Sequence, residues 1–191
     1  MTQSHPNFKD SLILFADLQL GIADLPLTVP GESLGKAVAA LAKLGSLRGV
    51  PTLVSTVQSQ AGDTKLIAPL EAALGEHILF VRSVCDSAQE PAILEAIEKS
   101  GRKKILISGV ATEIAVSLPA YTLQEKGFEV FVVVDATAGL SPRTEEAVHK
   151  SLVAAGVKLT TIASLAGVFA EHFSDPLAMQ AIGILYSMAE G

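Results

Sequence analysis

Residues 105–116 read ILISGVATEIAV, and this stretch joins a strand pattern directly to a helix pattern. It opens with a continuous apolar run, which is typical of a strand covered on both faces of a sheet. A helical pattern then extends over about 113–126, and Gly127 ends it. Pro119 removes the helical hydrogen bond to the carbonyl of Ala115, so we expect an irregular helix at this point.

The same alternation of strand and helix patterns continues on both sides of this stretch. Short apolar and β-branched runs predict six strands, at 11–16, 52–57, 78–81, 105–108, 131–134 and 159–162. Helical spacing predicts helices at about 34–44, 65–74, 91–100, 113–126 and 144–155, with an apolar helical segment after the last strand. Such alternation is typical of βαβ units. We therefore expect an α/β fold of three layers, α-β-α, with a six-stranded, mostly parallel, Rossmann-like sheet.

The composition narrows the class of protein. The chain has 191 residues, which fits a single domain over 1–191, since a domain takes about 100–200 residues. Hydrophobic residues make up 49% and charged residues 18%, with a mean hydropathy of +0.45, which excludes a disordered chain. No apolar run approaches the ~18–20 uncharged residues of a transmembrane helix, so we expect no membrane partner.

Charge and cysteine content exclude further classes. The net charge is −6 and the basic residues are scattered, so we expect no nucleic-acid partner. The single cysteine, Cys85, excludes an internal disulfide and fits a cytoplasmic location. The four histidines stand far apart, so we expect no metal site and no cofactor.

Polar residues follow several of the predicted strands. In parallel sheets ligands bind beyond the carboxyl ends of the strands, so these residues are the candidates for a site. Asp17 follows the first strand, with Gln19 two residues on, and Arg82 follows the third. A carboxyl group beside a guanidinium suits acid–base chemistry, although Asp17 could also cap a turn or pair structurally with Arg82. Asp135 follows the fifth strand, where we expect it to act as a cap or to anchor a loop.

The stretch from Gly109 to Val116 is the fourth candidate, because it runs from a strand end into a helix start. Free N–H groups at such a start favour anions and oxyanions. This arrangement suits a nucleophile with an oxyanion hole, simple carboxylate binding, or an ordinary turn between strand and helix.

Three segments together resemble the isochorismatase-like (cysteine hydrolase) superfamily. They are LFADLQ at 14–19, ISGVATEIAV at 107–116 and GFEVFVVVDA at 127–136. The resemblance covers about 10–172, which leaves 173–191 as a C-terminal helical extension. Residues 82–91, Leu118-Pro119-Ala120 and the C-terminal helices are most similar to a bacterial branch of octameric hydrolases of uncertain substrate.

The resemblance implies roles for particular residues. The family's amidases use an Asp, a Lys and a Cys: Asp17 stands at the position of the Asp, Arg82 at that of the Lys, and Ala115 at that of the nucleophilic Cys. The family also implies a non-proline cis peptide between Val110 and Ala111, and an oxyanion hole from the amides near Ile114 and Ala115. We expect Gln19, Val110, Ala111 and Ile114 to contact the substrate.

Two further departures from the family concern the pocket. Ala88 stands where the family tends to carry an aromatic residue, so we expect a wider or differently closed pocket wall. The Asp-x-His-His pattern of metal-binding nicotinamidases is absent, so the resemblance implies no metal. Cys85 lies three residues after Arg82 and could reach the same cleft, although a free cysteine is more often an inert small hydrophobe.

Three hypotheses for function stay open. The chain could be a hydrolase of a small carboxylate- or amide-bearing molecule that uses Asp17 as acid or base without a thiol. It could be an amidase inactivated by a Cys-to-Ala change at position 115, or a non-catalytic small-molecule-binding homologue. Apolar helices after Ala163 leave surface for subunit contacts, so we also expect a homo-oligomer, a dimer or larger.

Overall fold

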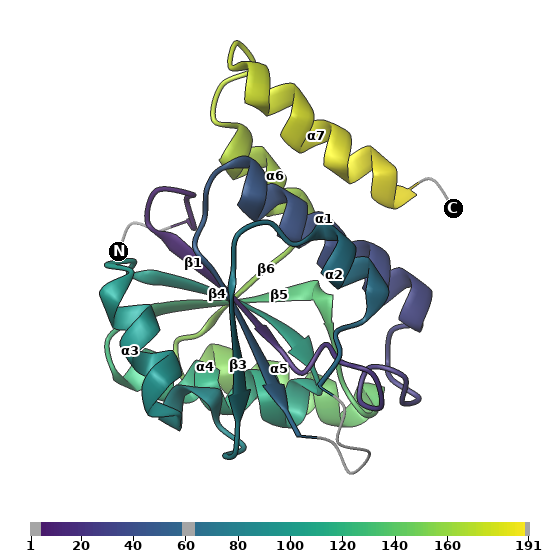
Figure 1. The fold of residues 1–191 in the computed structure, drawn as a ribbon, viewed down its shortest axis with the longest axis vertical. Helices are drawn as coiled ribbons and strands as arrows, with labels where there is room; N and C mark the ends of the chain where they lie inside the picture. The colour runs from purple at the N-terminus through teal and green to yellow at the C-terminus, as the bar shows by residue number, and fades with distance from the viewer. Residues whose placement is uncertain (1–4, 59–63, 190–191) are drawn as a thin grey trace.

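The computed structural model describes residues 5–58 and 64–189, and it is built around one parallel sheet (Figure 1). Six strands lie in the order β3-β2-β1-β4-β5-β6, and every neighbouring pair is parallel. The strands are β1 Ser11–Ala16, β2 Thr52–Val57, β3 Ile78–Arg82, β4 Lys104–Val110, β5 Glu129–Ala138 and β6 Lys158–Thr160. The predicted α/β fold is confirmed, and the sheet is wholly rather than mostly parallel.

Helices cover both faces of the sheet (Figure 1). They are α1 Gly31–Leu47, α2 Ala68–Ala73, α3 Pro91–Lys99, α4 Ser117–Glu125, α5 Pro142–Ala154, α6 Ile162–Ala170 and α7 Pro176–Ala189, with short turns η1 Ser87–Gln89 and η2 Thr112–Val116. Side chains alternate along β1: Ile13 and Phe15 belong to the core under α1, α2 and α6, whereas Leu12 and Leu14 belong to the core under α3 and α4. Because β1 is buried on both faces, its sequence is continuously apolar.

The structure of residues 104–125 differs in detail from the prediction. Strand β4 extends to Val110, and the single helix expected over 113–126 divides into a π-helical turn, η2, followed by α4. The N–H of Ser117 reaches back to the carbonyl of Thr112. The predicted irregularity is thus present, and it lies just before Pro119, which has no N–H to continue the helix.

Strand β5 is also longer than predicted. Its pairing with β4 shifts register between Ile107 and Gly109, after which Gly109 pairs with Thr137 and Val110 with Ala138. Asp135 therefore lies inside the strand rather than in a loop. The irregular register lets the small residues after Asp135 rejoin the sheet.

Backbones approach closely where β1 and β4 end. A Cβ built on Gly109 would lie 2.1 Å from the carbonyl oxygen of Ala16, with which Gly109 is in register. Only glycine fits here, and the contact brings the end of β4 against the residue that precedes Asp17.

The C-terminal helix α7 packs on α6 and α1 (Figure 1). Arg48, just after α1, donates through Nε to the Phe169 carbonyl at 2.7 Å and through Nη2 to the Ala170 carbonyl at 3.2 Å. Its Nη1 pairs with Asp175 at 2.7 Å, and its guanidinium lies 4.8 Å from the centre of the Phe8 ring. Arg48 thus joins α1, the end of α6 and the turn into α7.

No helix in the described part of the chain has the length and hydropathy to cross a membrane.

Candidate active site

The carboxyl ends of the central strands bring the predicted residues together. Asp17 is the first residue after β1, and Arg82 is the last residue of β3. Strand β2 lies between them, with Ser55 in register with Ala16 and Val57 in register with Arg82. This edge is where an open parallel sheet binds ligands.

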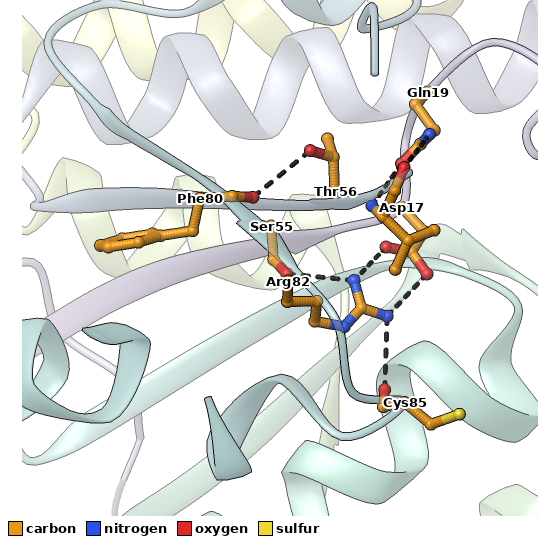
Figure 2. Close-up of polar contacts among 8 residues, drawn as sticks. Asp17, Gln19, Ser55, Thr56, Phe80, Arg82 and Cys85 are labelled. Carbon is orange, nitrogen blue, oxygen red and sulfur yellow. Dashed lines mark hydrogen bonds and ion pairs between the residues drawn. The ribbon is translucent and has the colours of Figure 1, made fainter. Parts of the chain in front are cut away.

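Asp17 and Arg82 form a buried, two-pronged ion pair (Figure 2). Arg82 Nη1 donates to Asp17 Oδ1, and Nη2 donates to Oδ2 at 2.8 Å. Nη1 also donates to Ser55 Oγ at 3.1 Å, and Nη2 to the Cys85 carbonyl at 3.3 Å. Only 2% of the Arg82 side chain and 9% of the Asp17 side chain are exposed.

These contacts occupy most of the donors of Arg82. A guanidinium has five N–H donors, of which the Nη atoms carry four. All four have partners, and the buried Nε has no hydrogen-bond partner among the described residues. Arg82 is therefore fitted to hold Asp17 in place, and it has little left to offer a carboxylate ligand.

Backbone geometry fixes Asp17 as firmly as its side chain does. Its φ of 55° is in the left-handed region, which non-glycine residues adopt at a cost. Its N–H donates to the Ser55 carbonyl at 2.9 Å. Residues held in such conformations cluster at functional sites, so Asp17 is the strongest candidate for chemistry here.

The structure corrects the expectation for Gln19. Both ends of its side-chain amide bond the backbone of Val57: Nε2 donates to the carbonyl at 2.7 Å, and Oε1 accepts from the N–H at 2.8 Å. The residue is completely buried. Gln19 therefore fixes the loop after β1 to the end of β2 instead of pointing to a ligand.

Turn η2 carries the other predicted residues. The peptide between Val110 and Ala111 is cis, as the family resemblance implies. Ala115 is 2% exposed, whereas Ile114 is 47% exposed beside it. The N–H of Ile114 donates to the Ala111 carbonyl at 3.1 Å. Of the two amides expected in an oxyanion hole, that of Ile114 thus already has a partner.

Cys85 and Ala88 lie in different surroundings near the ion pair. Cys85 contacts the pair through its backbone carbonyl, and its exposed side chain points away from the guanidinium (Figure 2). Ala88 is completely buried in the core cluster that also contains Ile93 and Ala120, so it lines no open pocket wall. Its N–H donates to Asp86 Oδ1 at 2.9 Å, which caps η1.

Asp135 anchors structure away from the ion pair. Its carboxylate accepts the Ile162 N–H, at 3.0 and 3.1 Å, and so caps the start of α6. Burial raises the pKa of the Asp135 carboxyl, and the bond from Ile162 partly opposes this rise. Of the two expected roles the structure shows the cap, and Asp135 supplies it from within β5 instead of from a loop.

Sequence reasoning missed Ser55, which lies near the carboxyl end of β2 and binds Arg82. A polar residue late in a buried strand was the available signal.

Among residues 5–58 and 64–189, no group of three or more His, Cys, Asp or Glu side chains gathers as a metal site.

Comparison with known proteins identifies the family. The model of the isochorismatase domain matches residues 11–164. The chain belongs to the isochorismatase family. Within it, the probable hydrolase YcaC of Escherichia coli K12 is 28% identical over 183 residues, covering 87% of this chain and 88% of YcaC. Isochorismatase domain-containing protein 2 of the rat is 25% identical over 160 residues, covering 83% of this chain and 73% of that protein.

Solved structures of the isochorismatase family agree. The crystal structure of E. coli YcaC, described as an octameric hydrolase of unknown specificity, has a TM-score of 0.88 at 25% identity and covers 98% of this chain and 92% of that one. Pseudomonas aeruginosa YcaC, solved with hexane-2,5-diol and covalent acrylamide, has a TM-score of 0.90 at 24% identity, covering 99% and 96%. The second likeness shows the fold alone.

Proposed function

We propose that this isochorismatase-family protein is a hydrolase in which the Asp17 carboxylate activates water as a general base. The two-pronged ion pair with Arg82 supports this role, because it fixes the Asp17 carboxylate at the sheet edge where ligands bind. Water would attack the carbonyl carbon as Asp17 takes its proton, and that proton would pass to the leaving group. A methyl group at Ala115 supplies no competing nucleophile.

The charges around the pair favour a neutral substrate over a carboxylate. Arg82 is neutralised by Asp17, and its Nη donors are occupied. Of the carboxylate- and amide-bearing molecules expected from the sequence, we therefore propose the uncharged amides and esters.

The reaction is tested by comparing the parent with Asp17→Asn on a panel of small primary carboxamides and esters. Release of ammonia or acid measures the hydrolysis. Removing a general base lowers turnover by roughly 10²–10⁴-fold. The matched control is Asp24→Asn, because Asp24 is an exposed carboxylate of the same loop, where it accepts the Gly21 N–H at 3.0 Å. Equal hydrolysis by the parent and Asp17→Asn would contradict the proposal.

The preference for a neutral ligand has its own test. Benzamide and benzoate have the same shape and differ in charge, so each is added at equal concentration and the melting temperature is recorded. A ligand that binds only the folded state stabilises it by RT ln(1 + [L]/Kd). We expect benzamide to raise the melting temperature more than benzoate, and the reverse order would contradict the charge argument.

The two alternatives give different results. If the chain is an amidase that lost its thiol, Ala115→Cys should release ammonia rapidly from the same carboxamides. If it only binds small molecules, a melting shift will occur without any product. We expect little amidase activity from Ala115→Cys, because an arginine stands where the family has its lysine.

We also propose that the protein is a cytoplasmic homo-oligomer. The octameric state of E. coli YcaC supports assembly. Exposed apolar side chains on this chain support it too: Ile78, Leu79 and Val81 on edge strand β3 are 53%, 46% and 56% exposed. Light scattering at micromolar concentration tests this, and a monomeric mass would contradict it.

A further inference from the structure

Two glutamates connect turn η2 with the start of α5. Glu145, in the first turn of α5, accepts a hydrogen bond from Thr112 Oγ1 at 2.8 Å. Glu113, in η2, accepts the Leu140 N–H at 3.0 and 3.1 Å and the Thr144 hydroxyl at 2.6 Å. Each segment thus sends one carboxylate to the other. We call Thr112, Glu113, Thr144 and Glu145 the η2 clamp.

Gly139 leaves the room that the clamp needs. A Cβ at this position would lie 2.7 Å from Glu145 Cβ and 3.0 Å from Glu113 Oε1. The Gly139 N–H donates to Thr28 Oγ1 at 2.9 Å, which fixes the loop from its other side. The clamp is therefore packed against the backbone at Gly139.

Turn η2 needs support from outside itself. It is a single π-helical turn, a form that is rare and frequent at functional sites. The proline at position 119 cannot donate the next backbone hydrogen bond to the Ala115 carbonyl. Side-chain bonds from α5 supply the restraint that a regular helix would obtain from its own backbone.

We propose that Thr112, Glu113 and Glu145 are positioning residues that hold η2, and with it position 115, at the sheet edge where Asp17 lies. They act through η2 and not on the substrate. The inference rests on the proposed function only in taking the sheet edge beside Asp17 as the place of the reaction. The effect of the η2 clamp on local opening can be measured without turnover.

The experiment uses a single thiol as a reporter of opening. In the double variant Cys85→Ser/Ala115→Cys, the introduced thiol is the chain's only one, since the sequence has a single cysteine. Iodoacetamide alkylation is followed by intact mass well below the melting temperature. Hydrogen exchange of residues 111–118 in the chain with its natural Ala115 gives a second measurement, in case the introduced thiol disturbs folding.

Two matched pairs of variants separate the clamp from general destabilisation. Thr112→Val keeps the shape of the side chain and removes the hydroxyl, whereas Thr112→Ser keeps the hydroxyl. Glu145→Ala removes a clamp carboxylate, whereas Glu146→Ala removes the exposed neighbour that pairs with Lys150 at 2.7 Å.

Loss of one hydrogen bond should raise both alkylation and exchange by about threefold to tenfold in Thr112→Val and Glu145→Ala. Thr112→Ser and Glu146→Ala should stay within about twofold of their parent. Unchanged rates in the first two variants would overturn the proposal. Exchange that rises equally in α6 would overturn it as well, because the effect would then be general. Neither result depends on hydrolysis, so a failure of the Asp17→Asn test remains distinguishable.

Discussion

Arg82 and Arg48 are both buried guanidiniums that pair with an aspartate, but they lie at opposite edges of the sheet. Arg82 ends β3 at the carboxyl edge, whereas Arg48 follows α1 just before β2 begins. Their side chains are 2% and 6% exposed, and their partners Asp17 and Asp175 are 9% and 31% exposed. Burial of an ion pair alone therefore does not distinguish a site from a structural connection.

The partners do distinguish them. Arg48 donates to the carbonyls that end α6, and the positive φ of Glu171 nearby belongs to the tight turn that follows this helix, in which the His172 N–H donates to the Ala170 carbonyl at 2.7 Å. Asp17 is left-handed with no helix end to explain it, at an edge where parallel sheets bind ligands. A positive φ at the carboxyl edge of the sheet, beside a buried carboxylate, is the feature that distinguishes the proposed functional pair.

The largest effect should come from breaking the Arg82 pair. Arg82→Met leaves the Asp17 carboxylate buried without a counter-ion, which costs about 3–5 kcal/mol of unfolding free energy. Urea unfolding measures this. The double variant Asp17→Asn/Arg82→Met should recover most of the loss, because the buried charge is then removed. A single variant as stable as the parent would show that Asp17 finds water in place of Arg82.

A smaller effect should follow from Arg48→Met. Asp175 keeps its contact with solvent, so the loss is that of hydrogen bonds from a charged group to two carbonyls, about 1.5–3 kcal/mol. The effect should also be local. We expect hydrogen exchange to rise in α7 before it rises in the sheet, and a uniform rise would remove the contrast with Arg82.

The smallest effect concerns pH. The pKa of the Asp175 carboxyl is lowered by the Leu177 N–H first and by the hydrogen bond from Arg48 next. A lowered folded-state pKa contributes stability above the unfolded value of about 3.9, and this stability is lost as the pH falls through the folded value. Melting temperatures of the parent and Asp175→Asn should therefore differ slightly at neutral pH and converge in acid. A difference that grows toward acid would contradict the sign.

The meeting of Asp17 with Arg82 could be predicted from sequence because both follow or end apolar strands, and parallel strands finish at one edge. Gln19 could not be placed in the same way. Strand β1 pairs with β2 only as far as Ala16 and Ser55, so the Val57 backbone on that side has no strand partner. The Gln19 amide has an NH2 group that donates and an oxygen that accepts, so it supplies both bonds. The Val57 backbone lacks these partners only in the assembled sheet, so no sequence pattern indicated this role for Gln19.

The bounds of β5 escaped prediction for a related reason. Asp135 and the small residues after it resemble a loop, yet a register shift against β4 keeps them in the sheet as far as Ala138. Likewise, Thr112 and Glu145 are far apart in sequence and meet only through the packing of α5 on η2. Local patterns therefore indicated the strand ends and their chemistry, while side-chain bonds between elements depended on the assembled fold.

The alanine at position 115 also bears on chemical damage. Hydrolases that depend on a thiolate are inactivated when peroxide oxidises the sulfur or an electrophile alkylates it. Here the only cysteine in the sequence is Cys85, and its side chain points away from the Arg82 guanidinium. The site that we propose, centred on the Asp17 carboxylate, would offer oxidants no target at the reacting atoms, so its chemistry would persist under oxidative stress that silences a cysteine hydrolase.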